Sequence, residues 1–518
     1  MHQSPSTRRL QFSNDCPFKK PRRFQETLDS DSPTLLELNA RHCDNAYVQA
    51  VTASLETLDF APLHDAYRGC GSLPYCPVLM LSIALFCILD GKRSPSQWCR
   101  AARESEPCRL LGRGIEPVRS TWYDFRDRAS KFIDSIHCQI VEQAINEGLI
   151  QATDGCLDGT FVDASASRHK HFSLSKISSR LNVLKRAVTQ LDKVPHVAAK
   201  KPLLKTPYWL ARTPAGRQRQ LQQYRNAKSQ ILKEIEGNRD LPNSLKRNEE
   251  TIVISPADPE AVIGRDKKHI VRPLYNVQYL TDYDADFILA YRVFCKKNDV
   301  GTLIPMIRLT QDIVSARLER VHADAGYCSL LELQDAKQER IELYAPVPTR
   351  SGSKKRLTKS GKEQFGQDRF YWEESSQSMT CPSGHLMQLV SRSKDPRAEG
   401  RFVIELRFEQ SESLCQACPL KDQCLSNDSQ RRTARRLESQ SVIDQQVEKM
   451  KSPAGLASQK RRKEMVERMH GDGKTHRDGE SFCCRGRKRA AAEAGLMVVA
   501  QNSFLIQKLR KAAKVKQF

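Results

Sequence analysis

Two aspartates in this sequence lie where strands are expected to meet the rim of a sheet. Asp158 lies in the strand-like residues 155–167, where Gly159 indicates that another group approaches the backbone closely. Asp324 closely follows a second strand-like run, residues 318–322, and precedes a glycine-containing turn. Carboxylate oxygens are the ligands that Mg²⁺ prefers. We therefore expect one metal site that is assembled from two distant segments.

A basic helix predicted over residues 458–470 offers a third carboxylate. Lys463 lies four residues before Glu467 and Lys474 lies seven after it, so a helix brings cations toward the face of this glutamate. A carboxylate between cations suits a site that binds both metal and phosphate. An ordinary salt-bridged surface helix has the same spacing. Glu464 is three residues from Glu467, and either glutamate can complete the site, with Glu467 preferred.

Composition favours a polyanionic partner and an intracellular location. The 518 residues include 84 Lys plus Arg against 61 Asp plus Glu, a formal net charge of +23. Nucleic acid is the commonest partner for such an excess, and a merely solvated basic surface is the alternative. The 17 cysteines are odd in number and scattered, which indicates reduced thiols in a cytosol. The longest apolar run, residues 78–89, is too short to span a bilayer, so a soluble protein without a membrane partner is expected.

The N-terminal part is predicted to be a flexible basic arm, residues 1–33, followed by a helical DNA-binding domain, residues 34–150. The arm either touches phosphates or is a solvated tail. In the domain, one helix is expected to start at Pro77, a second to be capped by Ser94 and a third by Ser120. The third carries aromatic and basic side chains. Three short helices with tight turns are compatible with a helix-turn-helix module.

Residues 151–345 are expected to form the first part of a catalytic core, into which a helical hairpin is inserted at about residues 168–250. Apolar side chains in the first helix of the hairpin repeat at coiled-coil spacing. They are Ile177, Leu181, Leu184, Val188 and Leu191. A second helix repeats the pattern less regularly. Three interpretations remain open: the hairpin clamps DNA, pairs with another subunit, or is purely structural.

Strands and helices alternate in the rest of this core. Residues 274–280 and 287–294 predict an antiparallel strand pair, and Asp299 is expected to cap the helix that follows. The strand before Asp324 and a helix near residues 329–337 come next. This order predicts an α+β fold with a mixed sheet.

Residues 346–450 are predicted to form an insertion that carries a cysteine cluster. Its thiols are Cys381, Cys415, Cys418 and Cys424, which have turn residues beside them. Four thiols can bind one tetrahedral Zn²⁺ ion, and reduced structural cysteines are the alternative. Residues 451–518 are expected to return to the core, with the glutamate helix and a final apolar helix at residues 496–509.

Three motifs of this sequence together are similar to those of a known family. They are Asp158-Gly159-Thr160 with Ala164 and Ser165, Tyr275-Asn276-Val277-Gln278, and Ala323-Asp324-Ala325-Gly326-Tyr327. With the helical residues 73–126, they resemble the DDE transposases of bacterial insertion sequences, in the group that has a cysteine-containing insertion before the final glutamate. The resemblance covers most of the chain from about residue 40.

The resemblance implies a ribonuclease-H-like catalytic core whose acidic triad binds two divalent ions, Mg²⁺ or Mn²⁺. Carried over by motif, the triad is Asp158, Asp324 and Glu467. Lys463 and Lys474 would bind the DNA phosphates near the scissile bond. Lys463 stands where the family usually has Arg, and Arg462, one residue earlier, is the alternative for that Arg. Two metal ions about 3.5–4 Å apart can activate the attacking group and stabilise the leaving oxygen of a phosphodiester.

The implied function is transposition, in which the chain binds the ends of an insertion sequence, cleaves the DNA and joins it to a target. The implied partners are DNA and a second copy of the chain, in the bacterial cytoplasm at the nucleoid. Two alternatives stay open: a transposase-derived DNA-binding protein that has lost cleavage, and a nuclease that never joins strands. The presence of all three carboxylates favours the active enzyme.

Overall fold

The computed structural model describes most of the chain from Phe24 to residue 516. Within that span it leaves out residues 26, 66, 68–72, 192–206, 267–268, 316, 349–363, 367–368, 398–399, 427–428 and 472–478, together with the side chains of residues 62, 190–191, 466–471 and 515–516. In the described parts of the chain, no helix is long and apolar enough to cross a membrane.

The N-terminal part is a helical module. Its helices are α1 (Pro33–His42), α2 (Ala46–Leu55), α3 (Ala61–Asp65), α4 (Pro77–Leu89), α5 (Pro95–Glu104), α6 (Glu106–Leu111), α7 (Arg119–Ala129) and α8 (Ile133–Asn146). Every residue of α4 is buried, because its sequence is apolar on all faces. The predicted cap at Ser94 is confirmed, since Ser94 and Gln97 form a capping box. The predicted cap at Ser120 is wrong: the N-cap of α7 is Val118, two residues earlier, and its side chain makes no capping hydrogen bond.

The predicted N-terminal arm ends earlier than residue 33. Residues 1–23 lie outside the described part of the chain. From Phe24 onward the chain packs on the helical module, because Phe24 is buried and the amide of Leu28 donates to the carbonyl of Arg113 at 3.0 Å. A segment with these contacts belongs to the module rather than to a solvated tail.

The helix that suggested DNA recognition, α7, turns its key side chains inward. Trp122 is fully buried. Arg126 is also buried and donates to the carboxylate of Asp127 at 2.7 Å. The guanidinium of Arg128 lies 4.6 Å from the ring centroid of Tyr67. These residues therefore stabilise the module, and the prediction that it binds DNA gains no support from them.

The region predicted to be the catalytic core contains a mixed sheet. Its strands are β1 (Asp154–Asp163), β2 (Val262–Arg265), β3 (Val271–Asp282), β4 (Ile288–Phe294), β5 (Arg320–His322) and β6 (Glu342–Tyr344). The order is β2-β3-β1-β5-β6, with β4 also paired to β3. β1 is antiparallel to β3 and parallel to β5, and β5 is parallel to β6. This arrangement is consistent with the predicted ribonuclease-H-like sheet, although the short strand β2 was not anticipated.

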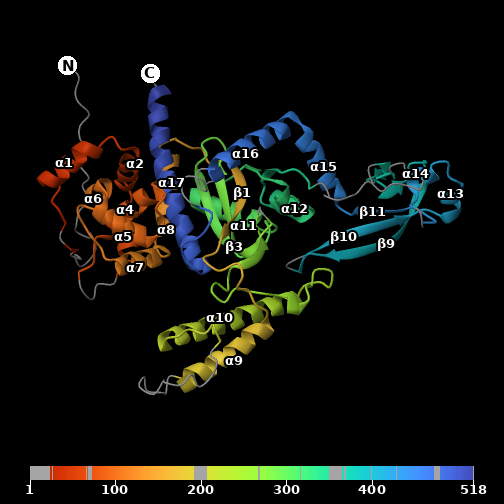
Figure 1. Ribbon diagram of the computed structural model, residues 1–518. Helices are drawn as coiled ribbons and strands as arrows, with labels where there is room; N and C mark the ends of the chain where they lie inside the picture. Colours follow the sequence, from red (N-terminus) through yellow and green to blue (C-terminus); the bar gives the residue numbers. More distant parts are fainter. Residues whose placement is uncertain are drawn as a thin grey trace.

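The helices that pack around this sheet come from before and after the cysteine-containing insertion in the sequence (Figure 1). They are α11 (Leu303–Val314), α12 (Leu330–Gln338), α15 (Gln440–Lys451), α16 (Pro453–Gly471) and α17 (Arg487–Lys516). The amide of Gln446 in α15 donates to the carbonyls of Leu343 and Ala345 beside β6. The cysteine-containing insertion therefore ends before α15 rather than at residue 450.

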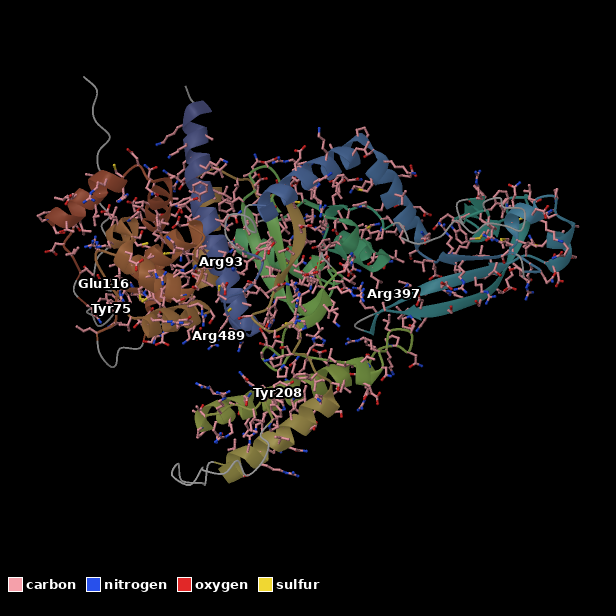
Figure 2. The ribbon with its side chains drawn as sticks, viewed as in Figure 1. Tyr75, Arg93, Glu116, Tyr208, Arg397 and Arg489 are labelled. Atoms are coloured by element: carbon pink, nitrogen blue, oxygen red, sulfur yellow. The ribbon has the colours of Figure 1, made fainter. Side chains whose placement is uncertain are left out.

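The long helix α17 lies between the helical module and the mixed sheet and packs on both (Figure 1). Arg93 of the module, labelled beside α17 in Figure 2, forms a buried ion pair with Glu493 of α17 at 3.1 Å. Arg93 also donates to the carbonyl of Ser481 at 2.8 Å, and Glu493 accepts from the amide of Cys483. A buried ion pair whose charges have further partners fixes how two elements meet, more than it adds to stability.

The predicted helical hairpin is present as α9 (Leu174–Leu191) and α10 (Pro214–Arg239). The apolar seam of α9 packs on α10 and forms a small core of its own. Its buried members include Ile177, Leu184, Leu221 and Ile231. In Figure 1 the hairpin projects from the edge of the region that contains the mixed sheet.

The cysteine-containing insertion forms a second, antiparallel sheet that extends from the core (Figure 1). Its elements are β7 (Tyr371–Glu373), β8 (Ser378–Thr380), β9 (Leu386–Pro396), β10 (Phe402–Glu409), α13 (Glu412–Ala417), α14 (Lys421–Cys424) and β11 (Thr433–Leu437). A few apolar side chains, Met379, Met387, Leu406 and Phe408 among them, make its core. So small a core leaves room for a further stabilising element.

The buried His137 predicts a pH dependence of stability. Burial lowers its pKa from 6.5 to about 4, although its ring donates to the carbonyl of Ile288. The unfolded chain therefore binds more protons than the folded chain between these values. Stability should be fully present above pH 6.5 and should fall as the pH drops toward 4, by roughly 3 kcal/mol from this residue.

This dependence is measured by chemical denaturation of the wild type and of His137→Gln at pH 7 and pH 5. We expect a smaller loss of unfolding free energy on acidification in the variant. The exposed His169→Gln is the matched control and should behave like the wild type. Equal losses in His137→Gln and the wild type would contradict the assignment.

Candidate active site

The pairing of β1 with β5 places Asp158 and Asp324 side by side. Cys156 in β1 pairs with His322 in β5, and the two strands run parallel. Asp158 lies two residues after Cys156, and Asp324 lies two residues after His322. Both side chains therefore leave the sheet on the same face. The predicted assembly of one acidic site from these two segments agrees with this register.

A cation from α16 lies between the two carboxylates. The Nη2 atom of Arg462 is 2.5 Å from Oδ1 of Asp158 and 3.6 Å from Oδ2 of Asp324. The side chain of Asp158 is 10% exposed and that of Asp324 43%, so one carboxylate is enclosed and the other opens to solvent. The sequence pointed first to Lys463 as the site cation of this helix, with Arg462 as the alternative; Lys463 is exposed. The cation that reaches the aspartates is its neighbour Arg462.

The electrostatics of the site favour a bound cation. Burial raises the pKa of Asp324, and Arg462 and the amide of Gly326 oppose that rise. The nearby carboxylates of Asp158 and Asp299 raise the pKa further. Two or more carboxylates at one place cannot all ionise cheaply unless a positive charge compensates them.

Gly159 makes the close approach that the sequence predicted. A Cβ atom at this position would lie 2.1 Å from Nε2 of Gln278 and 2.9 Å from Oδ1 of Asp299. A side chain there would displace the side chains of Gln278 and Asp299. The glycine beside the first aspartate therefore leaves room for these two polar groups.

His322 orients the strand and the helix that carry the site. Its ring is stacked on Tyr283, with centroids 3.9 Å apart, and on Tyr344. Nδ1 is hydrogen-bonded to Oγ of Ser458 in α16 at 2.7 Å. Burial lowers the pKa of His322 to about 4, so the ring is neutral at pH 7.

The structure corrects the role predicted for Asp299. Thr302 is the N-cap of α11 and no side chain caps that helix. The side chain of Asp299 turns instead toward the sheet, where Oδ1 accepts from Nδ2 of Asn276 at 2.9 Å and from Nε2 of Gln278 at 2.7 Å. The Asp299 carboxylate binds the two side-chain amides of β3 rather than the first backbone amides of α11, because two buried donors stabilise a charged acceptor more than a solvated backbone amide does.

The assignment of the third carboxylate stays a prediction. Glu464 is exposed, while the side chain of Glu467 and all of Lys474 lie outside the described part of the chain. In a regular α-helix residue 467 lies about 140° around the axis from Arg462. Helical spacing alone therefore does not place Glu467 on the face of α16 that carries Arg462.

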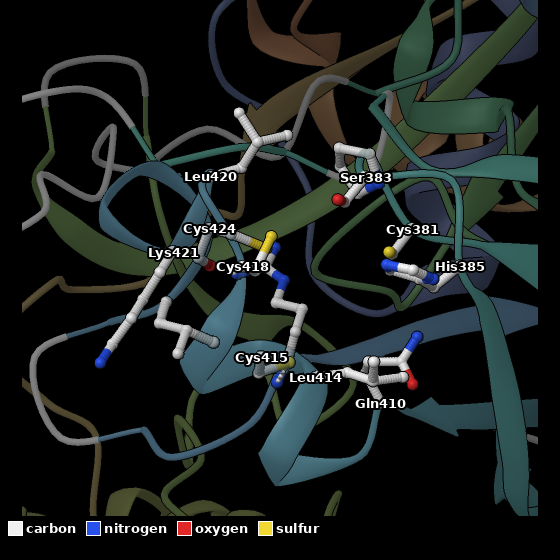
Figure 3. A pocket seen from close by; sticks show the side chains of 13 residues that line it. Cys381, Ser383, His385, Gln410, Leu414, Cys415, Cys418, Leu420, Lys421 and Cys424 are labelled. Atoms are coloured by element: carbon white, nitrogen blue, oxygen red, sulfur yellow. Dashed lines mark hydrogen bonds between the residues drawn. The ribbon is translucent and has the colours of Figure 1, made fainter.

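The four thiols of the insertion line one cavity together with His385, as Figure 3 shows. The backbone amide of Arg432 donates to Sγ of Cys415 at 3.4 Å. Burial raises the pKa of Cys424 to about 11, and the other three thiols contribute to the rise. Across the described residues, no three His, Cys, Asp or Glu side chains are placed to hold a metal ion as they stand. This holds for the thiols and for the aspartate site.

Comparison with known proteins gives one match. Residues 380–509 match the family model described as a transposase DDE domain. The matched segment includes the thiols, α15, α16 and most of α17, whereas Asp158 and Asp324 lie before it. No curated protein and no solved structure gives a significant match to the chain. The family match supports a DDE transposase, and the mixed α+β sheet is consistent with that class.

Proposed function

We propose that this chain is a transposase that binds the ends of an insertion sequence, cleaves the DNA and joins it to a target by two-metal phosphoryl transfer. The observation that carries the proposal is the pair of aspartates, brought together by the β1–β5 register around one cationic group. The match of residues 380–509 to a transposase DDE domain supports it independently, because that segment does not contain either aspartate.

The residues present suit a hard divalent cation. Asp158 and Asp324 direct oxygen atoms at the guanidinium of Arg462, which marks the place where positive charge is stabilised. These carboxylates, with Glu467 as the predicted third, would hold Mg²⁺ or Mn²⁺. The bound ions would activate the attacking oxygen and stabilise the leaving one. Arg462 and Lys463 of this helix, together with Lys474 beyond its last residue, would bind the DNA phosphates.

We predict that Asp158→Asn and Asp324→Asn abolish Mg²⁺-dependent strand cleavage but leave DNA affinity within about threefold of the wild type. Each change removes a metal-binding charge and leaves the basic surfaces in place. Cleavage is assayed on a duplex that carries the element's ends, and affinity by fluorescence anisotropy. Wild-type cleavage by either variant would refute the assignment.

The same assay separates the two glutamates. Glu467→Gln should remove cleavage, while Glu464→Gln, which changes an exposed neighbour in the same helix, is the matched control. The opposite result would assign the third carboxylate to Glu464. A wild-type chain that binds the ends and never cleaves would favour the alternative, a transposase-derived DNA-binding protein.

We infer that the hairpin is a DNA-binding arm of this enzyme rather than a subunit contact. Helix α9 carries four Lys or Arg and no acidic residue, and α10 carries six Lys or Arg against two Glu. Its apolar seam is already buried between the two helices, so little apolar surface is left for a second subunit. Phosphate binding needs only exposed charge.

The exposed cations of the two helices form what we call the hairpin basic surface. It consists of Lys176, Lys185, Arg186, Arg219, Arg225 and Lys233. Arg180 is excluded, because it stacks on Phe172 and Trp209 inside the hairpin. Tyr208, which is 96% exposed and is labelled on the hairpin in Figure 2, adds an aromatic ring to this basic setting. Since the cations surround the hairpin, we expect sequence-independent contacts with the DNA backbone.

Replacing Arg186, Arg219 and Arg225 together with Gln should weaken binding to random duplex DNA. The slope of log affinity against log salt should shrink by about 0.9 for each phosphate that the variant no longer binds. Arg239→Gln is the control, because Arg239 on the same hairpin is already paired with Glu249. An unchanged salt slope combined with a changed oligomeric state would assign the surface to subunit contact instead.

We propose further that the insertion binds one Zn²⁺ through Cys381, Cys415, Cys418 and Cys424. The support is their position around one cavity and the amide that points at Cys415. Metal analysis of the purified chain should give one zinc per chain, lost in Cys415→Ser and kept in Cys295→Ser, which removes an exposed thiol elsewhere. Absence of zinc from the wild type, with all four thiols freely titratable, would refute the site.

A further inference from the structure

Asp299 anchors a polar network on the strand next to Asp158. Asn276 and Gln278 are two residues apart on β3, so their amides lie on one face of the sheet, and both are fully buried. Both donate to Oδ1 of Asp299, at 2.9 Å and 2.7 Å. Nε2 of Gln278 also donates to Oδ1 of Asn276 at 2.7 Å. One carboxylate oxygen thus fixes two buried amides.

The network continues to the turn that carries Asp324. With its Nε2 directed at Asp299, Gln278 presents Oε1 to the hydroxyl of Tyr327, which donates to it at 2.5 Å. Tyr327 is fully buried and ends the short turn that Asp324 begins. A reversed amide would direct Oε1 at the carboxylate and lose both bonds. Asp299 therefore determines how this turn docks on β3.

The same carboxylate lies close to a glycine in each of the two aspartate segments. Gly159, the residue after Asp158, pairs with Gln278 across β1 and β3. A Cβ atom on Gly159 would lie 2.9 Å from Oδ1 of Asp299, and one on Gly326 would lie 3.5 Å from Oδ2. Asp299 thus lies between the strand of the first aspartate and the turn of the second.

We propose that Asp299 is a positioning residue for the metal site, which holds Asp158 and Asp324 at the separation that a divalent cation requires by acting through Asn276, Gln278 and Tyr327. The proposal rests on the proposed function for the identity of the ligands. Partners that orient metal-binding groups typically contribute 10–100-fold to metal affinity or activity. A buried polar network in which every group is hydrogen-bonded also makes a site rigid and specifies a single arrangement of its side chains.

Mn²⁺ binding, followed by the electron paramagnetic resonance signal of the free ion in the absence of DNA, tests the proposal. We expect Asp299→Ala to weaken Mn²⁺ binding by about tenfold or more. Asp299→Asn keeps an acceptor oxygen for both amides and should recover most of that affinity. Tyr327→Phe, which removes only the far hydroxyl, should cost a few-fold. In cleavage assays the losses should appear in kcat, with KM for DNA unchanged.

Asp282→Ala is the matched structural control. Asp282 is the last residue of β3 and is buried. Its carboxylate accepts hydrogen bonds from the backbone amides of Ala152, Asp284 and Ala285. Its replacement should lower the thermal midpoint of unfolding and leave Mn²⁺ affinity unchanged. An equal loss of Mn²⁺ affinity in Asp282→Ala, or wild-type affinity in Asp299→Ala or in Tyr327→Phe, would overturn the proposal.

The proposed function can fail separately. A wild type that binds Mn²⁺ in an Asp299-dependent manner but never cleaves DNA would uphold the positioning role and contradict the transposase activity. A wild type that cleaves DNA while Asp299→Ala binds Mn²⁺ normally would do the reverse.

Discussion

The parallel pairing of β1 with β5 is the constraint on which the rest of the site depends. It brings two carboxylates together on one face of the sheet, and like charges so close need a compensating cation. In this structure the guanidinium of Arg462 supplies that charge. We therefore interpret the sheet, helix α16 and the flanking hydrogen-bond networks by one role. They hold two carboxylates close together although the charges of these groups repel each other.

Distant parts of the chain share this task. His322 and Ser458 tie α16 to the strand beside the second aspartate, and Asp299 links that aspartate's turn to β3. Helix α17 packs on both the sheet and the N-terminal module, and a buried ion pair joins it to the module. The two insertions carry most of their contacts within themselves, which allows them to serve binding rather than the geometry of the site.

Sequence patterns correctly predicted the features that depend on neighbouring residues alone. The glycine at residue 159, the Ser94 cap and the coiled-coil seam of the hairpin follow from spacing and residue type, and the structure contains each. The side-chain direction of Asp299 could not be predicted in this way, because a helix start and a buried amide pair compete for the same carboxylate. Only the fold brings Asn276 and Gln278 close enough to donate hydrogen bonds to Asp299. The choice of Arg462 over Lys463 depends likewise on how α16 crosses the sheet, which helical spacing alone does not determine.

The central claim is that Asp158 and Asp324 hold a divalent cation at the place now taken by Arg462. Anomalous X-ray diffraction from crystals of the chain grown with Mn²⁺ tests it most directly. We predict a manganese peak at bonding distance from both aspartates, with the guanidinium of Arg462 displaced and Glu467 as a further ligand. A map in which manganese is absent from this position, while Arg462 still bridges the two carboxylates, would contradict the account.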